Sequence, residues 1–378
     1  VTRDEEHSTR GRANALRAVL SGALPQEEFT SRRMYEVMDL CLECKGCKAE
    51  CPSNVDMAKL KYEFLAHYYR ANGLPLRNRL FGRIERLSRL GSRLAPLSNW
   101  VAGSRLNRWL MERLVGIDRR RPLPLFARET FTEWFNHRQA PPAGTRGEVV
   151  LFHDTFVTYN APQIGKAAVQ LLERAGYAVK LVDKKCCGRP LISKGMLTEA
   201  KAHAAWNVER LLPSAERGVA IVGLEPSCLL TLRDEYVDLL RSDAARQVAK
   251  QSFLLEEFLE RERRKGLSLP FGANGRRALL HGHYHQKALV GTGPTVAALR
   301  WAGFDVQELA HAEEVELEDT AGLDGVGREL RGPLSVLADG DQGDEVGDGA
   351  VGDDEARGVP ALLAVHAQEE ADDLPLIG

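Results

Sequence analysis

The chain has 378 residues, of which 44% are hydrophobic and 28% charged, a composition typical of a soluble globular protein with two or three domains. An uncharged apolar run of about eighteen residues and a basic, then apolar leader are both missing from the sequence, so a membrane span and a secretory signal are excluded and a cytoplasmic location is expected. The net charge of −2 is unevenly distributed, because residues 305–378 hold 21 acidic residues and three arginines, whereas residues 1–304 carry a net charge of +16.

Apolar residues at helical spacing lie on both sides of a cysteine-rich segment. Leu16, Val19 and Leu20 precede it, and Ser53-Asn-Val-Asp56, which has the pattern of a capping box, follows it. The next apolar residues recur at helical spacing: Met57, Leu60, Phe64, Leu65 and Tyr68. Residues 1–70 are therefore predicted to form a mostly α-helical ferredoxin-like domain.

Four cysteines of this domain lie within eleven positions, as Cys41-Leu-Glu-Cys44-Lys-Gly-Cys47-Lys-Ala-Glu-Cys51-Pro. This C-x2-C-x2-C-x3-C-P spacing is the one by which bacterial ferredoxins bind [4Fe–4S] clusters. A zinc knuckle has no use for the third closely spaced cysteine, and a reducing compartment disfavours disulfides. The run therefore predicts iron–sulfur ligation by Cys41, Cys44, Cys47 and Cys51.

The role of Cys51 has two interpretations, since the fourth cysteine of this pattern ligates the other cluster in two-cluster proteins. Either Cys51 completes the cluster of Cys41, Cys44 and Cys47, or it serves a second cluster whose own cysteine run would precede Val1. We favour the second interpretation.

Residues 71–147 are predicted to be an arginine-rich helical connector. Positions 70–121 contain thirteen arginines and three acidic residues, and apolar residues recur at helical spacing from Leu80 to Leu97. The stripe indicates either an amphipathic packing helix with solvated arginines or a helix for a partner or membrane surface. Because Gly91, Pro96 and Gly103 interrupt it, we favour the packing helix. Few aromatic residues alternate with the arginines, so nucleic acid is not an expected partner.

Residues 148–310 alternate strands with helices, which predicts an α/β domain with a parallel sheet. Expected strands are 149–152, 178–182 and 219–222, and expected helices include 200–212 and 229–240. Cys186-Cys187-Gly188 follows the second strand and Cys228 follows the third, so the three thiols should meet at the carboxyl edge of the sheet. We expect iron–sulfur ligation by Cys186 and Cys187, whereas Cys228 is equally compatible with a ligand and with a small buried residue.

The end of this domain resembles its beginning. Leu172-Glu-Arg-Ala-Gly-Tyr-Ala-Val-Lys is similar to Leu299-Arg-Trp-Ala-Gly-Phe-Asp-Val-Gln, which predicts a degenerate internal repeat whose second copy lacks its cysteine pair. His281, His283 and His285 alternate, so on a strand their side chains would share a face and could bind a divalent metal ion. We favour the alternative that they bind no metal. Residues 311–378 are predicted to be a disordered, acidic, low-complexity tail.

Together these motifs resemble the iron–sulfur proteins of the glycolate oxidase, anaerobic glycerol-3-phosphate dehydrogenase and heterodisulfide reductase group. A narrower likeness, from Val1 to about Leu309, is to the carboxyl-terminal half of fused FAD-linked oxidases of the D-lactate or D-2-hydroxyglutarate dehydrogenase type. It rests on segments such as Cys51-Pro-Ser-Asn-Val-Asp-Met-Ala-Lys, Cys186-Cys-Gly-Arg-Pro-Leu-Ile-Ser-Lys-Gly and Glu225-Pro-Ser-Cys-Leu-Leu-Thr-Leu-Arg-Asp-Glu. Where that family usually has His-Gly-His-Cys-His-Gln, this chain has Tyr284, which argues against a cluster in the second copy.

The resemblance implies an electron-transfer module, which passes electrons from FAD on another domain or subunit through [4Fe–4S] to an acceptor such as a quinone or an electron carrier. Implied partners are thus the FAD-binding dehydrogenase part and this acceptor, with peripheral contact at the inner face of a membrane as a further option. Two alternatives remain: a disulfide or quinone reductase acting at the Cys-Cys-Gly site, and a truncated remnant without redox function.

Overall fold

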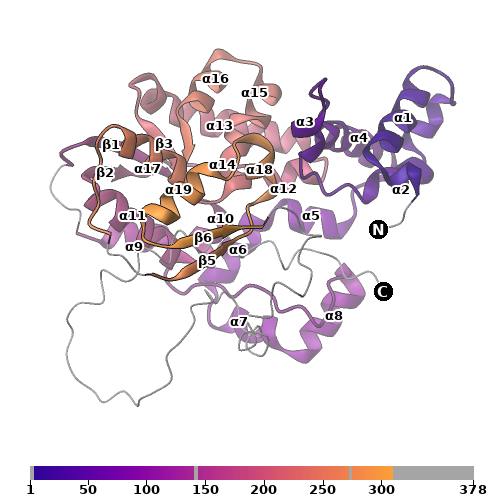
Figure 1. Ribbon diagram of the computed structural model, residues 1–378. Coiled ribbons are helices and arrows are strands. Elements are labelled where there is room, and N and C mark those ends of the chain that lie inside the picture. The colour runs from indigo at the N-terminus through magenta and orange to yellow at the C-terminus, as the bar shows by residue number, and fades with distance from the viewer. Residues whose placement is uncertain (1–3, 140–143, 272–274, 310–378) are drawn as a thin grey trace.

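The computed structural model describes residues 4–139, 144–271 and 275–309 (Figure 1). The predicted acidic tail, residues 311–378, lies outside the described residues. Among the helices of the described ranges, none has the length and apolar character needed to cross a membrane.

The amino-terminal part is helical, as predicted. Its buried core joins residues from both sides of the cysteine run, including Leu16, Met38 and Phe64. Its elements are η1 (Glu5–His7), α1 (Thr9–Leu20), η2 (Gln26–Thr30), α2 (Arg32–Asp39), α3 (Gly46–Glu50) and α4 (Met57–Asn72). The predicted capping box at Ser53 is wrong, because α4 begins at Met57 with Asp56 as its N-cap, whose carboxylate accepts a 3.1 Å hydrogen bond from the Lys59 N–H.

The arginine-rich connector is a series of short helices rather than one packing helix. These are α5 (Leu76–Gly82), α6 (Ile84–Arg93), α7 (Leu97–Gly103), α8 (Arg105–Val115) and, next to the sheet, α9 (Phe131–His137). Leu87, Leu90, Leu94 and Leu97 of the predicted stripe are exposed. The expectation that this stripe packs inward is therefore wrong, and its exposure agrees instead with the alternative of a surface-binding helix.

A parallel sheet forms the centre of the remaining chain, as predicted, and it has four strands in the order β2-β1-β3-β4. Its strands are β1 (Gly147–Phe152), β2 (Tyr177–Lys180), β3 (Ala220–Gly223) and β4 (Ser252–Leu254). The strand β4 was not predicted, because three residues are too few to show alternation. A separate parallel pair consists of β5 (Arg277–Leu280) and β6 (Asp305–Glu308).

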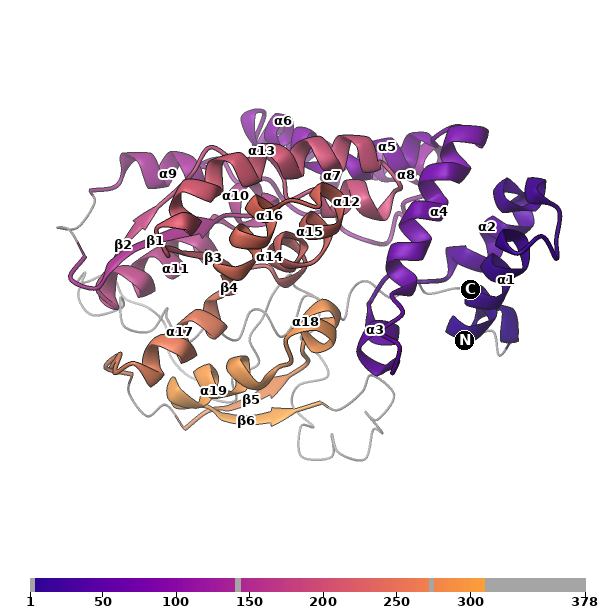
Figure 2. The same ribbon diagram turned by 90° about the horizontal axis from the view of Figure 1, so that it is seen from above.

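Alternating residues of the central strands build two cores on the two faces of the four-stranded sheet. Val149 and Val222 join the core of one face with α11, α17 and α19, whereas Val150 and Ile221 join the other with α13 to α16. Figure 2 shows the sheet between these helical layers. The helices are α10 (Thr155–Tyr159), α11 (Pro162–Arg174), α12 (Arg189–Ser193), α13 (Leu197–Glu216), α14 (Pro226–Arg233), α15 (Glu235–Leu240), α16 (Asp243–Lys250), α17 (Leu255–Arg264), α18 (Tyr284–Leu289) and α19 (Gly293–Trp301).

The two similar sequence segments adopt similar local structure. Each is the end of a helix, then a glycine with positive φ, then a strand: α11, Gly176 at 88° and β2 in one segment, and α19, Gly303 at 89° and β6 in the other. The predicted helix 229–240, in contrast, is divided at Asp234 into α14 and α15. This break places Asp234 and Glu235 at a junction, where both enter the interface described next.

The helical part contacts the α/β part through the cysteine run. Both views show α3 beside α18, and the two helices are in contact (Figures 1 and 2). The sequence-distant cysteine groups therefore belong to one interface region.

Candidate iron–sulfur sites

The loop of the cysteine run bends at two residues that are not glycine. Glu43 and Lys45 have φ values of 61° and 63°, in the left-handed region that costs an ordinary residue about 1–2 kcal/mol. Both residues lie between cysteines of the run, so the strained backbone is part of the Cys41–Cys47 segment itself. Such strain persists where surrounding contacts fix the loop, and it is common at functional sites.

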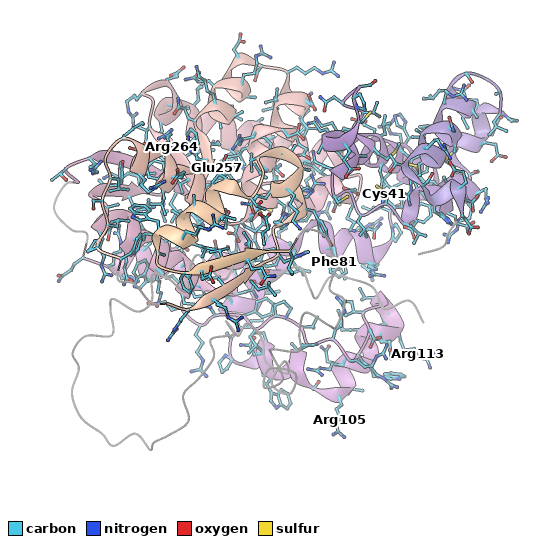
Figure 3. All side chains as sticks on the ribbon, viewed as in Figure 1. Cys41, Phe81, Arg105, Arg113, Glu257 and Arg264 are labelled. Carbon is cyan, nitrogen blue, oxygen red and sulfur yellow. The ribbon has the colours of Figure 1, made fainter. Side chains whose placement is uncertain are left out.

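Local geometry in this loop fits a bound cluster. A Cβ built on Gly46 would lie 3.8 Å from Cys44 Sγ, so the glycine leaves space on the side of the thiols. The Met57 N–H donates a 3.4 Å hydrogen bond to Cys47 Sγ, a contact that would stabilise a thiolate ligand. Cys41 and Cys47 pack at the edge of the helical core, and Figure 3 shows Cys41 within this part of the molecule.

Cys41 and Cys51 differ in their electrostatic environment. Burial raises the pKa of the Cys41 thiol, against the opposing effect of the Glu43 backbone amide. Hydrogen bonds from the backbone amides of Val55 and Ser53 lower the pKa of Cys51. Of Cys41 and Cys51, Cys51 is therefore the thiol that its surroundings favour in the ionised form.

The spacing of the sulfurs does not suit a single metal ion. Four thiolates bound to one zinc ion at about 2.3 Å lie within roughly 4 Å of one another. Within the described residues, the one group of three ligand-type side chains with all donor atoms within 4.8 Å is Asp4, Glu6 and His7, at the chain's exposed beginning. Within these residues, neither cysteine group therefore brings three sulfurs as close together as a single-ion site needs.

The second group of thiols meets at the carboxyl edge of the four-stranded sheet. Cys186 and Cys187 lie in the segment after β2, and Cys228 lies in the first turn of α14, after β3. All three are buried, and Cys187 Sγ is 3.1 Å from Cys228 Sγ. Gly188, at a φ of 87°, turns the chain into α12 directly after the pair. The structure therefore brings together thiols that are about forty positions apart in sequence, as expected.

Buried polar side chains hold the backbone of the cysteine pair. The side chain of Asn207, on α13, accepts a hydrogen bond from the Lys185 N–H at 2.8 Å and donates one to the Lys185 carbonyl at 3.1 Å. It also donates to the Tyr236 hydroxyl. Tyr236 in turn donates to the Cys187 carbonyl at 2.9 Å, and Glu85 of α6 accepts from the Cys186 N–H at 3.1 Å. Sequence reasoning missed these residues; a polar Asn207 among the apolar residues of α13 was the one local signal.

The environment of these three thiols opposes their ionisation in the absence of a cation. The pKa of Cys186 is raised by its interaction with Cys187 and by burial, and the pKa values of Cys187 and Cys228 are also well above the ordinary value. A coordinated metal deprotonates a thiol outright. The site therefore combines buried, preplaced sulfur donors with a need for positive charge, and it fits an iron-containing group.

A buried ion network joins the two cysteine groups. Lys45, whose side chain is 1% exposed, binds Glu235 Oε1 at 2.5 Å and also pairs with Asp234. Arg189, two residues after Cys187, binds the same Glu235 oxygen at 2.5 Å and Glu43 Oε2 at 3.0 Å. Burial disfavours the charge on Lys45, but Glu235 and Asp234 raise its pKa.

The three histidines do not share the face of a strand. β5 ends at Leu280, His283 is the N-cap of α18, and His285 lies within that helix, so the predicted arrangement on a strand is wrong. His285 Nε2 instead lies 3.0 Å from the Glu43 carbonyl oxygen, and burial lowers its pKa to about 2. A neutral imidazole here donates to the strained cysteine loop.

Comparison with known families covers both cysteine groups. Residues 1–56 match the 4Fe-4S dicluster domain, and residues 150–233 match the cysteine-rich domain. The first match contains Cys41 to Cys51, and the second contains Cys186, Cys187 and Cys228. The chain thus resembles a 4Fe-4S family in its helical part and a cysteine-rich family in its α/β part.

Individual proteins similar to this chain include subunits of dehydrogenases and oxidases. The chain is 30% identical over 227 residues to one of the subunits of the anaerobic glycerol-3-phosphate dehydrogenase of Escherichia coli, a match that covers 60% of this chain and 57% of the relative. It is 29% identical over 279 residues to D-2-hydroxyglutarate dehydrogenase of Pseudomonas putida, covering 62% of this chain and 27% of the relative. It is 27% identical over 270 residues to the glycolate oxidase iron-sulfur subunit of E. coli, covering 68% and 61%.

These matches confirm the resemblance that the sequence motifs indicated. The chain spans little more than half the length of the E. coli glycerol-3-phosphate dehydrogenase subunit. No solved structure matches the chain.

Proposed function

We propose that this chain is the iron–sulfur electron-transfer module of an FAD-dependent 2-hydroxy acid dehydrogenase. The observation that carries the proposal is the contact between the two cysteine groups: Lys45 of the first loop and Arg189 beside Cys187 bind the same Glu235 oxygen, and Arg189 also binds Glu43 of that loop. Two redox groups held by one rigid interface form a path along which electrons move in single steps.

In this proposal Cys41, Cys44 and Cys47 hold a [4Fe–4S] cluster, which supplies one-electron oxidation and reduction. Cys51 serves either the same cluster or a second one, and the match to a dicluster family supports the second role. Cys186, Cys187 and Cys228 provide three ligands of a further iron–sulfur group. Electrons would come from FAD on a partner domain or subunit and leave to a quinone or electron carrier. D-Lactate, glycolate and D-2-hydroxyglutarate are the candidate substrates of the assembly.

The proposed division of the chain follows the same roles. Residues 1–70 carry the first cluster, and residues 71–147 connect this part to the α/β domain. Residues 148–310 carry the Cys-Cys-Gly site, and residues 311–378 form the acidic tail. The similarity between the segments ending in β2 and β6 supports the interpretation of the last part of the α/β region as a second, incomplete copy. A cytoplasmic location remains part of the proposal.

A second candidate function is disulfide or quinone reduction at the Cys-Cys-Gly site. The 3.1 Å contact between Cys187 and Cys228 favours it, because these thiols could form a disulfide by losing two protons and two electrons to the substrate. A cavity of about 330 Å³ lies beside the segment that leads to Cys186, and it is lined among others by His153, Arg89 and Lys184. Two electrons from the first cluster and two protons would then restore the thiols.

Anaerobic iron and acid-labile sulfide analysis, with EPR after dithionite reduction, tests the proposal. The parent chain is compared with Cys44→Ser, Cys187→Ser and, as a control beside the cysteine run, Ser53→Ala. We expect about four irons to be lost in Cys44→Ser and further iron in Cys187→Ser. Iron loss in Cys44→Ser alone would favour the thiol chemistry of the second candidate. A parent chain that takes up no iron under reconstitution would contradict both functions.

A further inference from the structure

The connector helices α6, α7 and α8 expose ten large apolar side chains, which we call the amphipathic surface. They are Leu87, Leu90, Leu94, Leu97, Trp100, Val101, Leu106, Trp109, Leu110 and Leu114. An isolated exposed leucine is ordinary, but a contiguous series marks an interaction site. The series is also regular, since Leu97, Trp100 and Val101 follow the helical spacing i, i+3, i+4, as do Leu106, Trp109 and Leu110.

The helix α6 is arranged with its small residues inside and its leucines outside. Its buried residues are Ser88, Gly91 and Ser92. A Cβ on Gly91 would lie 2.5 Å from the Phe126 ring, and the Ser92 hydroxyl donates to the Ala127 carbonyl. Because these close contacts fix the inward face of α6, Leu87, Leu90 and Leu94 must point outward. Their exposure is a consequence of packing rather than of a loosely attached helix.

The helices α7 and α8 extend this surface away from the α/β part. Figure 1 shows both helices below the rest of the molecule, and in Figure 3 Arg105 and Arg113 of α8 extend outward. Trp100 is 74% exposed, and Leu106 and Leu114 are 68% and 70% exposed. Arg113 lies over the ring of the part-exposed Trp109, at 6.0 Å.

The charge of this segment is strongly positive. Residues 84–121 contain nine arginines and three acidic residues. Each acid already has an arginine neighbour: Glu85 with Arg89 at 3.6 Å, Glu112 with Arg119 at 3.7 Å, and Asp118 with Arg120 at 2.6 Å. An excess of six positive charges therefore borders an exposed band of leucine and tryptophan.

We propose that the amphipathic surface binds an anionic lipid bilayer, with α7 and α8 lying in the plane of the headgroups. Helices that lie on membranes combine arginine or lysine on the polar face with tryptophan and leucine on the other. Tryptophan prefers the headgroup level, and each basic residue near an anionic leaflet adds attraction. Because the three acids are already paired with arginines, the surface is positive throughout, a charge that complements an anionic leaflet. The inference does not depend on the proposed redox function.

Vesicle co-sedimentation of the full chain tests this inference. Vesicles of phosphatidylcholine alone are compared with vesicles that contain phosphatidylglycerol, at low salt and at high salt. We expect binding to the anionic vesicles, weakening at high salt because the arginines are screened. The double variant Leu106→Glu/Leu114→Glu should bind at least tenfold more weakly, and Arg105→Glu/Arg113→Glu should lose the preference for anionic lipid.

Matched controls separate this effect from a general loss of structure. Leu20, which is 74% exposed on α1, gives Leu20→Glu as the apolar control, and Arg217→Glu is the charge control. Both should bind like the parent, and circular dichroism and iron content should be unchanged in every variant. Equal binding to neutral vesicles, or equal loss in the Leu20→Glu control, overturns the proposal. So does absence of vesicle binding, including the case in which a second copy or residues 310–378 cover the surface.

Discussion

At the scale of single residues, the least expected feature is a lysine buried inside the cysteine run. Lys45 is 1% exposed and is stabilised by Asp234 and Glu235 at the junction of α14 and α15. Burial works against the ionisation of Asp234. Lys45, Lys59 and Lys48 nevertheless hold the pKa of Asp234 well below the ordinary value. Removing one partner of such a buried group is costly, since the other charges remain without compensation.

We therefore predict that Lys45→Met destabilises the protein by about 3–5 kcal/mol, the usual cost of breaking a buried ion pair. Lys59→Met is the matched control, because Lys59 also binds Asp234, at 2.7 Å, but its side chain is 23% exposed. Loss of the Lys59 ion pair should lower the free energy of unfolding by roughly 1 kcal/mol. Urea unfolding followed by circular dichroism measures both. Equal losses in the two variants would show that burial of Lys45 has no special role.

A second residue-level prediction concerns Asp154, the N-cap of α10. Its Oδ1 accepts from the Val157 N–H at 2.9 Å, whereas its buried Oδ2 has no hydrogen-bond partner. Burial, and then repulsion from Glu225, raises the pKa of Asp154 to about 6, with partial compensation from the Val157 N–H and from Lys184. The folded state therefore holds this proton more tightly than the unfolded chain, and stability falls as pH rises from about 4 to about 6.

Asp154→Asn should remove this dependence, since asparagine caps a helix equally well and carries no charge. Two pKa units correspond to about 3 kcal/mol, which is the largest gain expected for the variant above pH 7. Thermal unfolding across pH 4–8 is the measurement, with Asp183→Asn, whose side chain is 82% exposed, as the control. Parallel pH profiles for the parent and Asp154→Asn would contradict the assignment.

At the scale of elements, the docking of α4 against the α/β part depends on a glycine between α12 and α13. Gly195 has a φ of 67°, and a Cβ there would lie 2.7 Å from the backbone of Leu65 and Ala66. Gly218 has a φ of 74° with no atom within 4 Å of its Cβ position. The two glycines share the conformational requirement and differ in the close approach to α4.

Gly195→Ala should therefore be more destabilising than Gly218→Ala. In both variants the free energy of unfolding should fall by about 1 kcal/mol or more, because alanine disfavours positive φ. Gly195→Ala adds about 1–3 kcal/mol, because the new methyl group overlaps rigid backbone. Denaturant midpoints compare the two, and similar midpoints would show that α4 moves away at little cost.

At the scale of the whole molecule, local patterns predicted the parts better than their assembly. The cysteine spacing, the helix after it and three strands of the sheet follow from short-range periodicity and turn chemistry. The inward contacts of Gly91 and Ser92, which expose the leucines of α6, depend on Phe126 and Ala127, far along the chain. The two closest partners of Lys45, Asp234 and Glu235, are about 190 positions away, and a lysine among cysteines gives no local sign of burial.

The same interface couples the first cysteine run to the rest of the molecule. When Cys44→Ser removes the cluster, we expect the strained loop at Glu43 and Lys45 to relax, because its cysteines lose their common anchor. Asp234, Glu235 and His285 then lose their partners in that loop. Asp234 would keep its bond to Lys59 and Glu235 its bond to Arg189, so the carboxylates and the imidazole of α18 would be held less firmly rather than left unpaired.

Hydrogen exchange of the iron-loaded parent and of Cys44→Ser should reveal this coupling. Exchange should become faster in α15 and α18, the elements that contact the loop, and stay unchanged in α11 on the opposite face of the sheet. Ser53→Ala, which retains all four cysteines, should match the parent in every element. Unchanged exchange in α15 and α18 would show that the ion network holds without the cluster. A uniform rise that includes α11 would place the effect in global stability, because only a local interface confines the change to the elements that touch it.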